Sequence, residues 1–262
     1  MENNYLGRED APIPPDIWKV LDSTMAEAAK SVLTGRRLLH LEGPYGLGLK
    51  AVPLPDSRAE NGIITSGFVP VSLIDKTFRL SKRDLASSEK NGMPVNASAV
   101  ATAAIEAAMQ EDSLIFHGTR GQPGLLSSKG VSELKLSSWD AMGKAVEDVI
   151  SAVTLLDKAG FHGPYALALA PNRYNLLFRR YPQGGTELEY IEAMISEGVY
   201  KAPILESGGV LMASGRQYAA IVLGQDMSLG FIGPTGSESL EFSLSESIAL
   251  LIREPKAICV LK

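Results

Sequence analysis

The stretch from 49 to 80 constrains the fold most, because it is long and extended and has little helix character. Val69, Val71 and Leu73 alternate with their neighbours, and the alternation continues on the opposite parity from Lys76 to Leu80, which is the period of a β-strand. The middle of the stretch, DSRAENG, is polar and typical of a turn. The pattern predicts a β-hairpin arm, and about 14 residues each way at ~3.3 Å per residue reach roughly 45 Å. Such an arm has no core of its own, so we expect it to contact a neighbouring chain.

Composition indicates a soluble, folded protein. The 262 residues are enough to bury a large core, as one big domain or two modest ones. Hydrophobic residues make up 45% and charged residues 21%, which excludes bulk disorder. No stretch approaches the ~20 apolar residues that span a bilayer, and the start, MENNYLGREDAP, is polar and acidic rather than basic and then apolar. We therefore expect a cytoplasmic protein with no membrane partner.

Charge argues against nucleic acid as a partner. The formal net charge is −5, and the densest basic pairs are Arg36-Arg37 and Arg179-Arg180. A surface that binds nucleic acid gathers many more lysines and arginines on one face. We therefore expect no role in coating phosphates.

Periodicity predicts a mixture of helices and strands, which is the α+β class. After Pro14-Pro15, the apolar residues Ile17, Leu21 and Met25 recur at helical spacing, and Gly35 ends that helix. A Ser or Thr followed three residues later by Asp or Glu predicts further helix starts. Those starts are Ser81, Ser137 and Thr186; the other predicted elements are an alanine-rich helix over 96–116, a helix opened by Pro171, strands over 38–42 and 165–170, and a β-rich remainder from 209.

The sequence holds no recognisable catalytic constellation. His40, His117 and His162 are far apart and fit no zinc spacing, so we expect structural or surface histidines and no metal. The glycine run GPYGLGLK has neither phosphate-loop nor dinucleotide spacing, which favours a strained turn. Ser214 lacks the first glycine of a nucleophile elbow, and Cys259, within AICVL, is predicted to pack in the core. We therefore expect neither an enzyme activity nor a cofactor.

Stretches far apart in the chain carry a resemblance to a known family. They read GRRLLHLEGPYGLG from Gly35 to Gly48 and LGQDMSLG from Leu223 to Gly230, and the chain closes with LLIREPKAICVLK. With IFHG, GLLS and a second Gly-Pro-Tyr in the same order, the whole chain resembles the encapsulins of the linocin type, family 1. These are shell proteins with the Hong Kong 97-type phage capsid fold, so the resemblance implies an α+β, phage major-capsid-like fold.

The resemblance also implies a peripheral domain, an axial domain and an extended β-hairpin arm. The peripheral domain would begin with the N-terminal helix in 1–48, continue with a spine helix in 81–137 and return in 221–262. The arm would cover 49–80, where the alternation also predicts it, and the axial domain would cover 138–220. Members of the family close into icosahedral shells, and a closed homo-oligomer supplies the neighbour that the arm needs.

Encapsulin shells enclose cargo enzymes, typically ferritin-like iron oxidases or dye-decolorising peroxidases, so the resemblance links the chain to iron storage and oxidative stress. Each cargo enzyme carries a short C-terminal targeting peptide that docks inside the shell by apolar anchors and a few charge pairs. Matching positions imply a groove made of Arg36, Leu38, His40 and Asp226, with apolar walls from Leu21, Met25 and Phe231.

Three residues of this groove, His40, Leu38 and Asp226, leave its function open. His40 replaces the acidic residue that is common at its position, which argues against a salt bridge to a basic cargo residue there. Leu38 and Asp226 have a second interpretation, in which they only pack and cap the local sheet.

The resemblance places the loop Tyr181–Thr186 at the five-fold pore. Gln183, Gly184, Gly185 and Thr186 would leave a narrow, polar and nearly uncharged opening. An ordinary loop between two helices is the other interpretation. Some members bind flavin on an aromatic platform after the arm, but the corresponding stretch here, RLSKRDLASS, has no aromatic residue, and no flavin is expected.

Three functions fit the sequence. The first is a self-assembling shell that encloses cargo enzymes. The second is a viral or prophage major capsid protein, which would hold DNA instead of protein; the N-terminal helix, absent from viral relatives, favours the shell. The third is an enzyme, against which the lack of a nucleophile–base pair in a recognisable motif argues.

Overall fold

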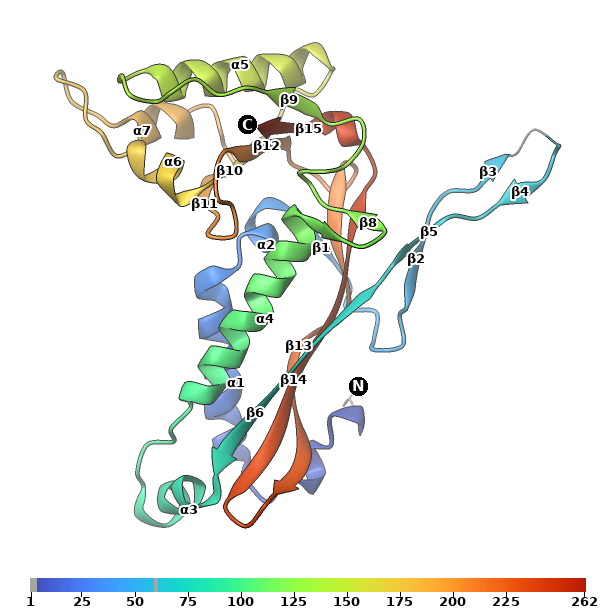
Figure 1. Ribbon diagram of the computed structural model, residues 1–262, viewed down its shortest axis with the longest axis vertical. Helices are drawn as coiled ribbons and strands as arrows, with labels where there is room; N and C mark the ends of the chain where they lie inside the picture. The colour runs from blue at the N-terminus through green and yellow to red at the C-terminus, as the bar shows by residue number, and fades with distance from the viewer. Residues whose placement is uncertain (1–3, 59–60) are drawn as a thin grey trace. The chain divides into compact units, whose positions relative to one another are not determined.

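The structure is a computed structural model that describes residues 4–58 and 61–262 (Figure 1). The chain forms two compact units. Unit 1 contains the residues up to Val32, Gly43–Glu111 and Leu223–Ala249, and unit 2 contains Leu33–Glu42, Asp112–Val222 and Leu250–Lys262. Each unit combines helices with strands that are distant in sequence, which confirms the predicted α+β class.

Unit 1 is made of two full helices, part of a third, and extended strands. Helix α1 begins at Pro15, in the first turn where proline is tolerated, as the sequence predicts. The elements are η1 (Asn4–Leu6), η2 (Arg8–Asp10), α1 (Pro15–Val32), β2 (Ala51–Pro53), β3 (Ser57–Arg58), β4 (Ile64–Thr65), β5 (Phe68–Pro70), β6 (Ser72–Ser81), α3 (Lys82–Asn91), and parts of α4 (Ser98–Phe116), β13 (Ala219–Thr235) and β14 (Ser239–Ile252).

The core of unit 1 is an aromatic cluster built on an antiparallel strand pair. Strands β6 and β14 are paired from Ser239 with Ser81 to Ile248 with Ser72. Because side chains alternate across a strand, Phe78 and Phe242 face the same side, where their rings stack at 5.5 Å. The rings of Trp18 and Phe231 meet Phe242 edge-on at 5.7 and 5.5 Å. The cluster therefore joins α1, β6, β13 and β14.

The arm is a shorter hairpin than the alternation predicts. Its paired part lies between Ala51 and Pro70, with β2 antiparallel to β5 and β3 antiparallel to β4. The stretch Ser72–Ser81, predicted as its return strand, pairs with β14 instead, because Ile74, Phe78 and Leu80 bury one face there. The arm therefore ends near Pro70, and the rest of the predicted arm, up to residue 80, belongs to the sheet.

Helix capping confirms two predicted starts and corrects one. The Ser81 hydroxyl accepts bonds from the backbone of Arg83 and Asp84 at the start of α3, and Thr186 forms a capping box with Glu189 at the start of α7. The predicted start at Ser137 is wrong, because α5 begins only at Lys144. The Ser137 side chain donates to Asp148 at 2.9 Å and is not available as a cap.

Unit 2 contains a five-stranded sheet with the order β11-β10-β12-β15-β9. These strands are Val199–Lys201, Tyr165–Leu169, Gly209–Ala213, Ile258–Leu261 and Ser132–Leu134 in that order, and the other elements are α2 (Gly35–Leu38), β1 (His40–Glu42), β7 (Gly118–Thr119), β8 (Gln122–Pro123), α5 (Lys144–Lys158), α6 (Pro171–Leu176), α7 (Glu187–Glu192) and η3 (Pro255–Ala257). Along the interior strand β10, between β11 and β12, every residue is buried.

Helix α5 packs against this sheet with one apolar stripe. Val149, Ala152 and Leu156 of α5 are buried in the same cluster as Leu167 of β10 and Cys259 of β15. Their helical spacing places them on one face, and the opposite face, with its charged residues, remains exposed. The single cysteine is thus a core residue, as the sequence predicts.

The predicted strand over 38–42 is shorter, because a helical turn precedes it. Asp112, itself buried, accepts bonds from the backbone N–H groups of Thr34 and Gly35 at 2.8 and 2.9 Å. These bonds satisfy donors that a helix start leaves without partners and stabilise α2. Strand β1 therefore starts at His40, where it pairs in parallel with β13 at Ala220.

Candidate functional site

The arm carries the largest group of exposed apolar side chains in the described part of unit 1. Ile63, Ile64 and Phe68 are 61%, 58% and 65% exposed. A two-stranded ribbon has no second layer, so these side chains find no core within the arm. Backbone pairing and small polar contacts hold its shape, such as the bond from the Ser66 hydroxyl to Asp56 at 2.8 Å. The arm thus presents apolar side chains that the subunit itself leaves exposed.

The root of the arm brings together the two stretches that stand out in the sequence. The backbone N–H of Tyr45 donates to the carbonyl of Leu223 at 3.0 Å, and that of Gly46 donates to Gly224 at 2.6 Å. Gly43 has a φ of 108°, and a Cβ there would lie 2.5 Å from the Leu223 carbonyl oxygen. Only glycine accepts both conditions. The glycine-rich stretch is a strained turn, as predicted, and it fixes the arm to β13.

In unit 1, the residues predicted for peptide binding differ sharply in exposure. Leu21 is 0% exposed and Met25 is 8% exposed, so both lie in the core beside α1. Asp226 is exposed, and its carboxylate accepts a bond from the backbone of Met227 at 2.8 Å. Phe231 is half-buried and rests on Phe242. Asp226 and Phe231 therefore offer surface to a ligand, whereas Leu21 and Met25 support unit 1 from within.

The other three predicted residues lie in unit 2, on α2 and β1. His40 is exposed at the start of β1, Arg36 is half-buried, and Leu38 is buried at 4% exposure. Strand β1 is tied down at its end, where Glu42 forms an ion pair with Arg253 at 3.0 Å. The role of all seven residues in peptide binding stays a prediction.

The loop Tyr181–Thr186 is a compact turn with an exposed tip. Inside it, the Tyr181 N–H donates to the carbonyl of Gly185 at 3.0 Å, and the Gly184 N–H donates back to Tyr181 at 2.9 Å. Gly184 and Gly185 have φ values of 99° and 82°, which favour glycine. Gln183 is exposed at the tip, and Thr186 caps α7. The place of this loop at a pore stays a prediction.

The titratable groups of the loop keep it close to neutral. Burial and the nearby Glu187 carboxylate raise the pKa of the Tyr181 phenol, so this hydroxyl stays protonated at neutral pH. The tip residues Pro182, Gln183 and Gly184 carry no charge. The exposed tip of the loop therefore carries no charge.

The described residues hold no group of three or more His, Cys, Asp or Glu side chains placed to bind a metal ion. Within 4–58 and 61–262, no helix is long and apolar enough to cross a membrane.

Burial raises the pKa of the Cys259 thiol to about 11, which keeps it protonated and a poor nucleophile at neutral pH. His117 and His162 contact the Ile204 carbonyl and the Asp157 carboxylate separately.

Sequence reasoning missed the contacts that hold the loop and the N-terminal segment. At the base of the loop, Glu187 pairs with Arg179. In the N-terminal segment, Arg8 pairs with Asp22 at 2.6 Å, and its guanidinium lies 4.0 Å from the Trp18 ring centroid. An arginine among solvated residues gives no sign of such a partner. The one available signal was Glu187 in the first turn of a predicted helix, where acidic residues are favoured.

Comparison of its sequence with known proteins gives one family. The family model described as "Encapsulating protein for peroxidase" matches residues 3–249. The type 1 encapsulin shell protein EncA of Myxococcus xanthus is 31% identical over 278 residues, which cover 99% of this chain and 96% of that one. A ferritin-like–encapsulin shell fusion protein of Pyrococcus furiosus is 29% identical, over 78% of this chain and 57% of the fusion.

Two solved structures show the same fold. A virus-like particle from Pyrococcus furiosus matches with a TM-score of 0.76 at 24% identity, over 94% of this chain and 99% of that one. The capsid of Myoviridae phage XM1 matches with a TM-score of 0.57 at 14% identity, over 85% of this chain and 88% of that one. These likenesses confirm the predicted phage major-capsid-like fold.

Proposed function

The chain belongs to the encapsulin family of shell proteins, and from that premise we propose that its shell encloses a guest enzyme, binds it through a short peptide and admits small solutes through openings lined by the loop Tyr181–Thr186. Assembly into a shell is the function of the family, and the likeness to relatives named as shell proteins runs over nearly the whole chain. A viral capsid is not favoured, because the relatives by sequence are named as shell proteins, whereas phage capsids share the fold at only 12–15% identity.

One observation carries the shell function, which is the exposed apolar arm. Ile63, Ile64 and Phe68 are each more than half exposed. Fully burying one such side chain stabilises a complex by about 1.5–3 kcal/mol, and a closed shell repeats that gain at every copy. Contact between the arm and a neighbouring copy accounts for a surface that a single subunit would otherwise leave in water.

Relatives support the proposal of a guest enzyme. The family model is described as encapsulating a peroxidase, and one relative is a fusion of a ferritin-like protein with an encapsulin shell. We assign peptide contacts in unit 1 to Asp226 and Phe231. As a separate assignment in unit 2 we give them to Arg36 and His40, with the buried Leu38 as support. Asp226, Phe231 and His40 have exposed surface that a peptide can contact. Leu21 and Met25 are buried in the core of unit 1, so they support it without touching the peptide.

The shell itself catalyses nothing in this proposal, and the chemistry belongs to the guest. The relatives are named as structural shell proteins, and the Cys259 thiol is buried and protonated. We place the assembled compartment in the cytoplasm, where guest and shell are made together.

Electron microscopy of the purified protein, with mass spectrometry of what co-purifies, tests the proposal as a whole. We expect uniform icosahedral particles that contain one protein in a fixed ratio to the shell. Particles filled with DNA would favour the viral alternative, and small empty oligomers would contradict both readings.

The peptide contacts are tested by co-expressing the shell with a fluorescent protein that carries the C-terminal segment of the co-purifying guest. Asp226→Ala removes an exposed carboxylate, so we expect fewer fluorescent molecules per shell with assembly unchanged. Asp10→Ala is the matched control, since Asp10 is also an exposed aspartate of unit 1. Equal loading in both variants would overturn the assignment of Asp226.

A further inference from the structure

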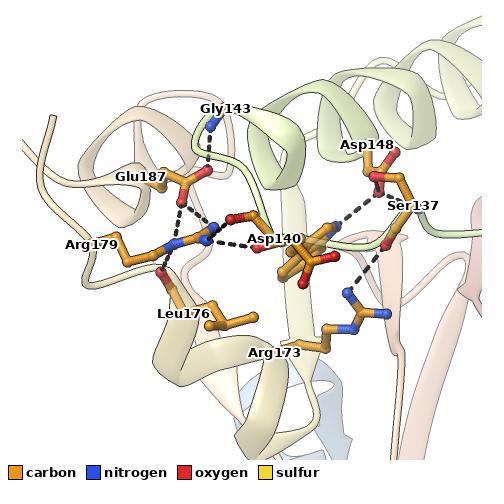
Figure 2. A network of polar contacts seen from close by, with 9 residues as sticks. Ser137, Asp140, Gly143, Asp148, Arg173, Leu176, Arg179 and Glu187 are labelled. Carbon is orange, nitrogen blue, oxygen red and sulfur yellow. Dashed lines mark hydrogen bonds and ion pairs between the residues drawn. The ribbon is translucent and has the colours of Figure 1, made fainter.

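An ion pair with a fully buried carboxylate lies at the base of the loop Tyr181–Thr186, and the side chain of its arginine is 26% exposed. Glu187, at the start of α7, is 0% exposed. Its Oε2 accepts bonds from Arg179 Nη2 at 2.7 Å and Nε at 3.1 Å, and its Oε1 accepts the backbone N–H of Gly143 at 2.8 Å (Figure 2). Because Arg179 precedes the loop and Glu187 follows it, this pair closes the loop at its base. The Gly143 bond attaches it to the start of α5.

The same arginine binds the segment that leads into α5. Arg179 Nη1 donates to the carbonyl of Trp139 at 2.6 Å and Nε donates to that of Leu176 at 3.0 Å (Figure 2). A guanidinium presents its donors in a rigid, planar fork, so contacts in several directions fix its position as well as its charge. The Arg179 side chain therefore holds α6, the loop and the segment from Ser137 to Gly143 in one arrangement.

The segment from Ser137 to Gly143 also has contacts that do not involve Arg179. The Asp148 carboxylate, on α5, accepts bonds from the Ser137 N–H at 2.8 Å and from Trp139 Nε1 at 2.8 Å. Arg173 donates to the Ser137 carbonyl at 3.2 Å, and its guanidinium lies 5.0 Å from the Trp139 ring centroid. Figure 2 shows these contacts converging on the segment from both sides. The base to which the pair is attached is thus rigid.

The tip of the loop has contacts of a different kind. Pro182, Gln183 and Gly184 are exposed, and the turn is closed by backbone bonds and by the bridge between Arg180 and Thr186. Tyr181 adds one ring contact, with Tyr190 at 5.2 Å. The position of the tip therefore depends on how firmly its two ends are held, and the buried pair holds both.

We infer that Arg179 and Glu187 are positioning residues for this loop, and that their ion pair sets the rate at which small solutes cross the shell. The inference rests on the proposed place of the loop at an opening. A buried pair contributes little net stability compared with apolar side chains of the same size, but it defines one geometry. Its function here is to keep the opening narrow while leaving the exposed tip free of charge.

The first test measures hydrogen exchange of the amides from 181 to 185 in assembled shells. In Arg179→Met the loop loses its closure, so we expect exchange at these amides to rise at least about tenfold. Arg180→Met is the matched control, because it removes the same charge from the neighbouring residue, whose side chain is exposed. Equal exchange in both variants would overturn the inference.

The second test measures passage into the shell. Shells are reassembled around a fluorescent dextran too large to leave, and the neutral quencher acrylamide is added in a stopped-flow instrument. We expect quenching to be several-fold faster in Arg179→Met than in the wild type or in Arg180→Met. Faster exchange without faster quenching would contradict the inference by showing that the loop does not line the opening. No change in either measurement would show instead that the pair does not hold the loop.

A variant that cannot assemble is covered by a second one. Arg179→Met leaves a buried carboxylate without its cation, whereas Arg179→Met/Glu187→Leu replaces the pair by apolar side chains and removes that penalty. The double variant still lacks the bonds to Gly143 and Trp139, so we expect normal shells with a mobile loop and fast quenching. Normal shells with wild-type exchange and quenching would overturn the inference.

Discussion

The arm and the loop Tyr181–Thr186 are both hairpin-like segments with exposed tips, but they are held in opposite ways. The arm displays Ile63, Ile64 and Phe68 to water, and none of its residues whose exposure is described, 51–57 and 61–70, is buried. The loop is short and polar, and a fully buried carboxylate fixes its base. The difference teaches that the contacts that order the loop lie within one chain, whereas we propose that another copy orders the arm.

The two kinds of chemistry suit the two tasks. Apolar burial is non-directional and grows with area, so it favours association between copies that must close into a shell. An ion pair in which two guanidinium N–H groups bond one carboxylate oxygen is directional, so it favours a single position of a segment. A shell needs the first along its contacts and the second wherever the size of an opening matters.

The largest expected effect comes from breaking the apolar character of the arm. We expect Ile64→Asp/Phe68→Asp to abolish shells while the subunit stays folded, because both side chains are exposed in the subunit and lose nothing there. Size-exclusion chromatography and circular dichroism measure the two properties. Met93→Asp is the control, since Met93 is 56% exposed but lies outside the arm. Intact shells from the double variant would show that the arm does not drive assembly.

The next effect breaks the anchor of the loop. Arg179→Met leaves Glu187 buried without its cation, and removing one partner of a buried pair typically costs ~3–5 kcal/mol. We expect a clear fall in the Tm of unit 2, with Arg180→Met close to the wild type because an exposed charge contributes little. Similar Tm values for the two variants would mean that the pair is no more important than a surface charge.

A third prediction concerns the root of the arm, which the chain does hold by itself. Gly43 and Gly46 both have positive φ, at 108° and 105°, but a Cβ meets the Leu223 carbonyl only at Gly43, and nothing lies within 4 Å of a Cβ at Gly46. Gly46→Ala therefore costs only backbone strain, about 1–3 kcal/mol. We expect Gly43→Ala to lower the Tm further, and equal effects would contradict the close approach of the two strands.

The smallest effect concerns an exposed polar contact in unit 2. Asp157 accepts bonds from the Tyr165 hydroxyl at 2.7 Å and from His162 at 3.1 Å, and both lower the pKa of its carboxyl. A lowered carboxyl pKa gives stability that is present above the unfolded pKa and lost as the pH falls through the folded value. We expect Asp157→Asn to lower the Tm slightly at pH 7, and the difference to vanish in acid. A difference that persists in acid would refute this ionic origin.

The sequence predicts much of this fold because periodicity and caps are local signals. The spacing of apolar residues after Pro15 gives α1, and Ser81 and Thr186 mark true helix starts. Ser137 has the same local pattern and fails, because its hydroxyl bonds to Asp148 on α5. The length of the arm was overestimated for a similar reason, since alternation does not reveal which strand β6 pairs with.

The candidate sites are less predictable than the fold, because they depend on contacts between distant residues. Arg179 and Arg180 are identical neighbours in the sequence, and only the structure shows that Arg179 reaches Glu187 and Trp139. The resemblance nominated Leu21 beside Asp226 for one groove, yet one is in the core and the other is exposed. Exposure follows from packing partners, which a motif does not contain.

The comparison between arm and loop is tested most directly by hydrogen exchange in dissociated subunits and in closed shells. We predict that the amides of the arm, from 51 to 70, exchange rapidly in subunits and become protected only in shells. We predict that the hydrogen-bonded amides of the loop, those of Tyr181 and Gly184, are already protected in subunits, because Arg179 and Glu187 belong to the same chain. An arm that is equally protected in both states would contradict the claim that another copy holds it.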